Sequence, residues 1–210
     1  MTPERASALA RDHGTDGVLE VRSIDGGEAE IVIWNPDGSQ AEMSGNGTRI
    51  AARWLAERSG RGAVAIRVGS RTVRARVRDG EVEQELGRVE VGAPEVVEGV
   101  ELVRVSVGNP HAVVRGDPAE VERIGRLLER HASFPHGTNV QVARVDAPGH
   151  VTARVWERGV GETTSSGTSA VAVAAATHGD GDVVVAFPGG QLAVRLQDGV
   201  AYLTGPAERL

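Results

Sequence analysis

Two short stretches decide how this chain folds: Met43-Ser44-Gly45-Asn46-Gly47-Thr48 and Glu162-Thr163-Thr164-Ser165-Ser166-Gly167-Thr168-Ser169. Each leads directly into an apolar segment, which predicts a helix that begins near Ser44 or Ser166. The first N–H groups of a helix have no intrahelical partner, and they carry partial positive charge. Two such helix starts facing each other would form a two-sided site for an anion such as a substrate carboxylate.

The composition limits the class of protein. Of the 210 residues, 40% are apolar but only 3% are aromatic, so the core must consist of Val, Ala, Leu and Ile. The formal net charge of −6 argues against a nucleic-acid partner, which would require a basic surface. There is no apolar run of about 18 residues and no signal-like start, so we expect a soluble, cytoplasmic protein without a membrane partner. The chain has no cysteine, which excludes disulfides.

Hydrophobic periodicity predicts a mixture of strands and a few helices. Helices are expected over residues 2–13, 47–58, 118–131 and 167–177, and strands over 30–34, 64–68, 72–78, 81–91, 102–107, 140–145, 151–156, 183–187, 192–196 and 200–203. In the segment 72–78, Val and Ala alternate with Arg, which is typical of a half-buried strand. The segment 167–177 is apolar nearly all round, so we expect this helix to be buried inside a curved sheet.

The helix expected over 118–131 has a clear start and a clear apolar side. Asp117 precedes Pro118 and is the expected N-cap. The spacing of Ile124, Leu127 and Leu128 predicts that these three side chains point inward.

The two halves of the chain repeat one plan, in which strands precede a helix begun by a Ser-Gly turn and further strands follow it. This repetition predicts an α+β fold of two similar domains, residues 1–96 and 97–210, with the boundary between Gly92 and Gly99. Each domain is expected to be a curved mixed sheet or barrel around a central helix. The last residues could also pack back on the first domain.

Short motifs in a fixed order resemble the signatures of the diaminopimelate epimerases. They are Asn35-Pro36-Asp37-Gly38-Ser39, Met43-Ser44-Gly45-Asn46-Gly47-Thr48-Arg49, Gly108-Asn109-Pro110-His111, Thr138-Asn139-Val140, Glu157-Arg158-Gly159-Val160-Gly161-Glu162-Thr163 with Ser166-Gly167-Thr168, Pro188-Gly189-Gly190 and Thr204-Gly205-Pro206-Ala207. One such motif would carry little weight, but the matches run in order over nearly the whole chain. The chain is therefore identified as resembling this family.

The resemblance implies an isomerase of lysine biosynthesis that works without pyridoxal phosphate, another cofactor or a metal. Two related domains enclose a substrate site in the cleft between them. One thiol removes the α-proton and another delivers a proton to the opposite face, which interconverts L,L- and meso-diaminopimelate. Such an inversion needs a base and an acid on opposite sides of one carbon. A homodimer is one assembly that the resemblance allows.

The resemblance also assigns roles to individual residues. The catalytic positions are Ser44, Ser166, His111 and Glu157, and the substrate-binding positions are Asn35, Gly45, Asn46, Asn109, Asn139, Glu157, Arg158, Gly167 and Thr168. Arg158 is expected to bind a carboxylate in the bidentate manner, with Glu157 as an orienting acceptor. The remaining histidines (His13, His131, His136, His150 and His178) show no metal-ligand spacing, so we assign no metal.

Each of these residue types also has an ordinary structural explanation. Ser44 and Ser166 could serve only as helix N-caps. Asn35 and Asn109 each precede a proline, a pair that favours turns. Without the surrounding motifs, these structural explanations would be preferred.

The main departure from the family is the replacement of both thiols by serine. A thiol has a pKa of about 8.5 and supplies thiolate near neutral pH, whereas an aliphatic hydroxyl needs a partner base. We therefore expect the epimerase activity to be impaired. The region before Pro3 also lacks the strand and the Gly-x-x-Asn-Asp turn with which the family opens, so one substrate contact is expected to be missing.

Three other functions stay open. One is a different isomerase or dehydratase on the same scaffold, similar to the proline racemases, and another is an amino-acid-binding protein without catalysis. The third, a serine hydrolase, is disfavoured because neither Ser44 nor Ser166 lies in a Gly-x-Ser-x-Gly turn.

Overall fold

The computed structural model of the chain describes residues 1–41 and 43–207. It divides into two compact units, one formed by Met1–Glu85 with Pro206 and Ala207 and the other by Leu86–Gly205. The expected boundary, between residues 96 and 97, lies later in the chain. The difference arises because the strand over Glu90–Val97 pairs with the strand that follows it and so stays with the second unit. Residues 208–210 lie outside the described part.

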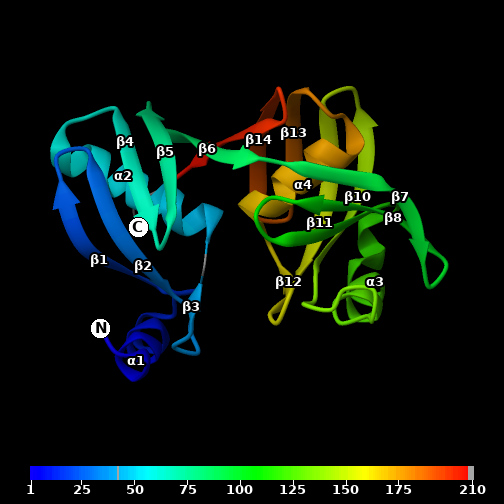
Figure 1. Ribbon diagram of the computed structural model, residues 1–210, viewed down its shortest axis with the longest axis horizontal. Coiled ribbons are helices and arrows are strands. Elements are labelled where there is room, and N and C mark those ends of the chain that lie inside the picture. Colours follow the sequence, from blue (N-terminus) through cyan, green and yellow to red (C-terminus); the bar gives the residue numbers. More distant parts are fainter. Residues whose placement is uncertain (42, 208–210) are drawn as a thin grey trace. The chain divides into compact units, whose positions relative to one another are not determined.

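The first unit is a mixed sheet on which helix α2 packs, with α1 against its first two strands (Figure 1). Its elements are α1 (Pro3–His13), β1 (Val18–Asp25), β2 (Glu28–Trp34), β3 (Gln40–Ala41), α2 (Gly45–Ser59), β4 (Ala63–Val68), β5 (Arg71–Arg78) and β6 (Glu81–Arg88). The strand order is β1-β2-β4-β5-β6, with β3 added to β2. Strands β2 and β4 are parallel, and α2 makes the crossover between them. Leu55 of α2 packs with Ile31 and Ile66 in the core.

The second unit is larger and encloses its central helix. Its elements are β7 (Glu90–Val97), β8 (Val100–Ser106), β9 (Pro110–Arg115), η1 (Pro118–Glu120), α3 (Val121–Leu128), β10 (Asn139–Ala147), β11 (His150–Glu157), β12 (Gly161–Thr163), α4 (Gly167–Thr177), β13 (Gly181–Phe187), β14 (Gly190–Gln197) and β15 (Val200–Pro206). The strand order is β15-β14-β13-β11-β10-β9-β8-β7, with β12 added to β11. Helix α4 contacts β8, β9, β10, β11, β13 and β14 (Figure 1).

The two units share one structural repeat. The series β1-β2-β3-α2-β4-β5-β6 in the first unit corresponds to β10-β11-β12-α4-β13-β14-β15 in the second. Each series begins with an antiparallel hairpin, to whose second strand a short third strand is added. The central helix then leads to a strand that runs parallel to the second hairpin strand and pairs with it. The predicted α+β fold of two similar units is thereby confirmed.

The central helices differ in how far their sheets cover them. Residues 167–175 of α4 are all buried, as its all-round apolar sequence predicted. Helix α2 instead keeps Ile50 (51% exposed) and Trp54 (37% exposed) on its outer side. The sheet of the first unit therefore encloses its helix only in part.

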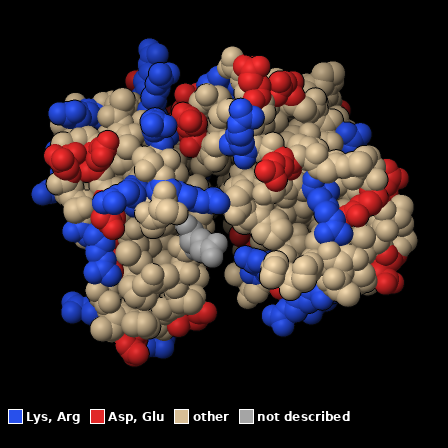
Figure 2. Space-filling view, viewed as in Figure 1, with Lys and Arg blue, Asp and Glu red and all other residues tan. Residues whose placement is uncertain are grey.

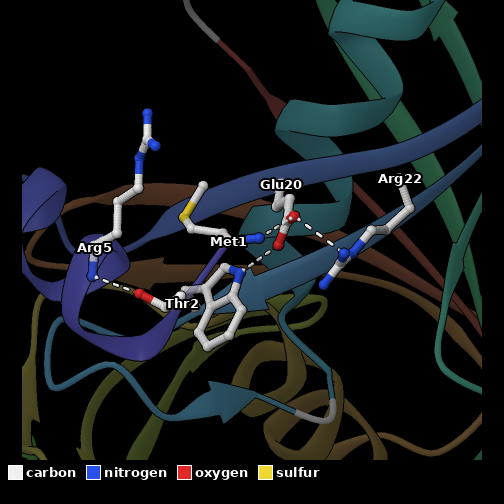
Figure 3. A network of polar contacts seen from close by, with 6 residues as sticks. Met1, Thr2, Arg5, Glu20 and Arg22 are labelled. Atoms are coloured by element: carbon white, nitrogen blue, oxygen red, sulfur yellow. Dashed lines mark hydrogen bonds and ion pairs between the residues drawn. The ribbon is translucent and has the colours of Figure 1, made fainter.

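A polar network fixes β1 against the end of β2, just before Asn35 (Figure 3). The Glu20 carboxylate accepts hydrogen bonds from the Met1 amino group at 2.8 Å and from Trp34 Nε1 at 2.9 Å, and Arg22 Nη1 lies 3.3 Å from it. These donors, first the Met1 amino group and then Trp34, hold the pKa of Glu20 below its usual value. The network anchors the strand end that carries the turn at Asn35.

Local predictions are confirmed in β5 and corrected in α3. Val73 and Ala75 of β5 are buried, while the alternating Arg74 and Arg76 are exposed. The helix expected over 118–131 is shorter, since η1 precedes α3, and Asp117 caps η1 as predicted. The prediction for Leu127 was wrong, because its side chain is 37% exposed. The inward position is taken by Gly125, which lies against Trp156 of β11.

No helix in the described part of the chain combines the length and the apolar character that crossing a bilayer requires.

We predict that Gly125→Ala destabilises the second unit. A Cβ at this position would lie 2.4 Å from Trp156 Cγ, so the indole that precedes Glu157 would have to shift. Overpacking costs about 1–3 kcal/mol, which exceeds the gain of about 1 kcal/mol from the better helix propensity of Ala. Urea unfolding should therefore show a lower free energy of unfolding.

Gly116→Ala is the matched control. Its added Cβ would meet only Val142 Cγ1, at an ordinary 3.6 Å. Equal stability of the Gly125→Ala variant and the native chain would contradict the close packing of α3 on β11.

Candidate active site

Ser44 begins helix α2 and caps it. Its backbone is extended (φ −141°, ψ 119°), and its Oγ accepts a hydrogen bond from Gly47 N at 3.0 Å. Gly47 has no room for a side chain, since an added Cβ would lie 3.2 Å from Leu19 and 3.3 Å from Ile33. The Gly-Asn-Gly sequence thus lets the first turn of α2 pack tightly on the sheet while the N–H groups of Gly45 and Asn46 stay without intrahelical partners.

A buried glutamine of β6 makes hydrogen bonds to the first turn of α2. Gln84 and Thr48 are both fully buried, and their side chains lie 2.7 Å apart. In the amide orientation that satisfies both ends, Gln84 Oε1 accepts from Thr48 Oγ1 and from Arg49 N, while Nε2 donates to Gly45 O at 3.0 Å. The side chain thereby fixes the backbone next to Ser44.

A buried guanidinium lies beside the same turn. Arg49 is only 8% exposed, donates from Nε to Pro206 O at 2.9 Å, and donates from Nη2 to Asn46 Oδ1 at 2.8 Å. Its Nη1 has no hydrogen-bond partner among residues 1–41 and 43–207, and burial lowers the pKa of the guanidinium. Within the described residues no carboxylate pairs with it, so its positive charge adds to that of the helix start.

Asn35 serves first of all its own turn. Its Nδ2 donates to Ser39 Oγ at 2.9 Å, and its backbone N–H donates to Ser39 O at 2.8 Å. Asp37 Oδ1 accepts from Ser39 N at 2.9 Å, and Gly38 closes the turn with a φ of +84°. This turn leads into β3 and from there to Ser44.

Ser166 begins α4 with nearly the same backbone as Ser44 but with a different environment. Its φ of −150° and ψ of 126° are those of an N-cap, yet its side chain makes no cap hydrogen bond. The residue is 7% exposed. The N–H groups of Gly167, Thr168 and Ser169 therefore all lack an intrahelical partner at this helix start.

Three of the sequence-predicted residues of the second unit are joined by hydrogen bonds around the start of β9, and a fourth, Asn139, bonds to the backbone there. His111 Nε2 lies 3.0 Å from Asn109 Oδ1, and Asn109 Nδ2 donates to Thr168 Oγ1 at 3.4 Å. Asn139 Nδ2 donates to Pro110 O at 3.0 Å. The parallel pairing of β9 with β10 puts Asn139 opposite His111.

The turn after β11 brings Glu157 and Arg158 to the same end of the sheet. Asn139 Oδ1 accepts from Arg158 N at 3.0 Å, and Arg158 Nη1 donates to His136 O at 2.7 Å. Glu129 supports the turn by accepting from Trp156 Nε1 at 2.8 Å and from Gly159 N at 2.7 Å. Arg158 is exposed and, among the described residues, has no carboxylate partner.

Two titratable groups of the second unit have shifted pKa values. Burial lowers the pKa of His111 to about 3, and the positive charge of Arg158 also lowers it. Burial raises the pKa of Glu157, while the hydrogen bond from Thr163 Oγ1, at 2.5 Å, acts against this. His111 is therefore a neutral imidazole at pH 7.

The predicted residues fall into one group in each unit. Ser44, Gly45 and Asn46 form the first turn of α2, with Asn35 in the preceding turn. The second group consists of Asn109, His111, Asn139, Glu157, Arg158, Ser166, Gly167 and Thr168. Their roles, and a common site between the two groups, stay predictions.

Sequence reasoning missed the side chains that support both groups, which are the buried Thr48, Gln84, Arg49, Gln141 and Ser169 and the half-buried Glu129. The available signal was a glutamine within an otherwise apolar strand, as in Val140-Gln141-Val142. Such a residue is costly to bury unless it makes hydrogen bonds.

The charges give no sign of a metal centre or of a single-signed surface. Among the described residues, no group of three or more His, Asp or Glu side chains is placed to hold a metal ion. Figure 2 shows Arg and acidic side chains interspersed over this face of each unit.

Comparison with known proteins gives one family. A model of the diaminopimelate epimerases matches residues 5–97 and 103–210. A diaminopimelate epimerase of Thermobifida fusca is 40% identical over 92% of this chain and 80% of the relative.

Solved structures with low sequence identity share the fold. A predicted epimerase from Pseudomonas aeruginosa has a TM-score of 0.71 at 16% identity and covers 95% of this chain and 84% of its own. A hydroxyproline epimerase from Agrobacterium vitis, with bound trans-4-hydroxy-L-proline, has a TM-score of 0.65 at 19% identity. The match covers 90% of this chain and 71% of the epimerase.

We predict that Ser44→Ala and Ser166→Ala differ in stability. Loss of the cap bond from Gly47 N should cost the Ser44 variant about 1 kcal/mol, whereas Ser166 has no cap bond to lose. Chemical unfolding of the two variants measures the difference, and equal losses would contradict the assigned asymmetry.

We also predict that His111 makes the fold sensitive to acid. The unfolded chain binds a proton at this residue near pH 6.5, but the folded chain does so only near pH 3. Between these values the unfolded state binds more protons, so stability is complete above pH 6.5 and falls as the pH is lowered toward 3, by at most roughly 1.4 kcal/mol per pH unit.

His111→Gln should flatten this part of the stability profile, measured by urea unfolding at several pH values. His150→Gln is the control, since His150 is exposed. An unchanged profile in the His111 variant would show that the acid sensitivity comes from other groups.

Proposed function

Because the chain belongs to the diaminopimelate epimerase family, we propose that it binds diaminopimelate, with Ser44 and Ser166 at the two proton-transfer positions. One observation carries this proposal. Each unit starts its central helix with a serine at the same place in the structural repeat, and the two serines share one backbone conformation. An inversion at carbon needs one group on each face, and a duplicated unit supplies two equivalent positions.

The binding part of the proposal uses charge and unpaired N–H groups. The N–H groups of Gly167 and Thr168 at the start of α4, with those of Gly45 and Asn46 at the start of α2, are suited to a substrate carboxylate. The exposed guanidinium of Arg158 can bind a second carboxylate in a bidentate manner. Asn109 and Asn139 lie beside these groups and would fix the orientation of the amino acid.

The proton-transfer part is expected to be slow in this chain. A thiol ionises near pH 8.5, whereas a serine hydroxyl must be activated by a base. Within the described residues neither serine donates to a histidine or carboxylate, and the ring nitrogens of His111 are engaged by Asn109 and Gln141. The same contacts argue against a Ser-His-acid hydrolase, in which the histidine would have to reach the serine.

We further infer a cytoplasmic enzyme that needs no pyridoxal phosphate and acts as a homodimer or a monomer. Inversion at the α-carbon by acid–base residues alone requires no prosthetic group. The absorption spectrum of the purified protein and its mass in solution test these two points.

The central prediction concerns restoration of the thiols. The double variant Ser44→Cys, Ser166→Cys should exchange the α-hydrogen of diaminopimelate with solvent deuterium at a rate at least a hundredfold above that of the native chain, because thiolate becomes available. Each single variant should support exchange from one face at most. Proton NMR of L,L- and meso-diaminopimelate in D2O follows the reaction.

Binding has to be measured separately from exchange. Calorimetric titration with L,L- and meso-diaminopimelate, and with trans-4-hydroxy-L-proline as the comparison ligand, shows which amino acid the site accepts. Bound diaminopimelate without exchange in the double variant would reject the two-thiol mechanism for this scaffold. Binding of hydroxyproline alone would instead favour an epimerase of the proline type.

A further inference from the structure

Five side chains around the start of α4 form a continuous hydrogen-bonded chain in the second unit. Gln141 Nε2 of β10 donates to Ser169 Oγ at 2.9 Å and lies 3.0 Å from His111 Nδ1. His111 Nε2 lies 3.0 Å from Asn109 Oδ1, and Asn109 Nδ2 donates to Thr168 Oγ1. Since Thr168 and Ser169 are neighbours in the first turn of α4, the two ends of this hydrogen-bond network meet and form a ring.

From Gln141 through His111 and Asn109 to Thr168, each side chain donates to the next, and Gln141 also donates to Ser169. An amide nitrogen can only donate, so His111 Nδ1 must accept from Gln141. In the neutral imidazole the proton then resides on Nε2, which donates to Asn109 Oδ1. The Asn109 amide is thereby oriented with its Nδ2 toward the start of α4.

We propose that Gln141 is a positioning residue, which holds His111 in the Nε2–H form and through it sets the orientation of the Asn109 amide at the substrate site. The tautomer and the amide orientation follow from contacts within the second unit alone. The importance for substrate rests on the proposed function, in which Asn109 and Thr168 contact diaminopimelate.

The surroundings of Gln141 support a role beyond packing. It is fully buried between Val140 and Val142, which are both completely buried as well. Within the described part of the chain its Oε1 has no hydrogen-bond partner, which costs stability relative to an apolar side chain. What this glutamine does provide is a bridge from β10 to both His111 and α4.

The charges near the imidazole favour the neutral form. Among the described residues, Arg158 is the charged group whose field acts on His111, and its positive charge disfavours an imidazolium. The hydrogen bonds accordingly fix the orientation of the imidazole and of the Asn109 amide, and they do not require His111 to gain or lose a proton.

Gln84 is a matched control within the same protein. It is also fully buried in a strand, and it also contacts a hydroxyl in the first turn of a central helix, Thr48 of α2. It has no contact with an imidazole among its hydrogen bonds in the described part of the chain. A change that acts only through general loosening of a buried glutamine should therefore have similar consequences at both positions.

The first test reads the tautomer of His111 by 15N NMR of the imidazole, with its signals identified by their loss in His111→Gln. In the native chain we expect a protonated Nε2 and an unprotonated Nδ1. Gln141→Met should shift the population toward Nδ1–H, whereas Gln84→Met should leave the His111 signals unchanged. Gln141→Glu puts an acceptor next to Nδ1 and should place a proton there.

The second test measures calorimetric affinity for diaminopimelate. Gln141→Met should weaken binding roughly tenfold, because Asn109 is no longer held in one orientation. Gln141→Asn, which keeps the amide but is one methylene shorter, provides a second variant if the Met variant does not fold.

The outcomes separate the two proposals. An unchanged His111 tautomer in the Gln141 variants, or an equal change in Gln84→Met, overturns the positioning role. A changed tautomer with unchanged affinity for diaminopimelate also overturns it. Absence of diaminopimelate binding in the native chain refutes the proposed function, and the NMR result still decides whether Gln141 sets the tautomer.

Discussion

The unpaired N–H groups at the start of a buried helix are the constraint on which the rest of this structure depends. A helix that runs inside a curved sheet cannot satisfy its first N–H groups by its own backbone, and burial makes each unsatisfied donor costly. The chain places a serine at each start, and Ser44 Oγ accepts from Gly47 N, whereas among the described residues the Ser166 side chain makes no cap bond. The donors that stay without partners are available to a ligand, so the folding problem and the candidate site are the same feature.

Duplication gives two such helix starts, but the chain surrounds them differently. The first turn of α2 lies beside the buried charge of Arg49, and the cap bond of Ser44 occupies one donor. The start of α4 has no cap bond and is instead held by the neutral chain through Gln141 and His111. The repeat therefore sets the geometry of both helix starts. The local side chains make the start of α2 more electropositive and leave more N–H groups at the start of α4 available to a ligand.

Features carried by local pattern could be predicted from the sequence, and features set by distant contacts could not. The all-round apolar α4 and the alternating β5 were predictable, because burial leaves a direct trace in each. Strand β9 was missed because it begins at a proline and is buried on both faces, which removes alternation. Gln141 was missed for a different reason: its partner Ser169 lies 28 residues away, and only the folded sheet brings them together.

The size of the stabilisation that a helix N-terminus gives to an anion decides whether a serine hydroxyl can ionise there. A helix N-terminus stabilises a nearby anion by at most about 2 kcal/mol, which corresponds to roughly 1.5 pKa units. That shift brings a thiol of pKa about 8.5 into the neutral range, but an aliphatic hydroxyl, whose pKa is far higher than that of a thiol, stays protonated. The groups proposed to bind carboxylates need no ionised residue at position 44 or 166. Binding and proton transfer are therefore separable in this chain, and the serines remove only the second.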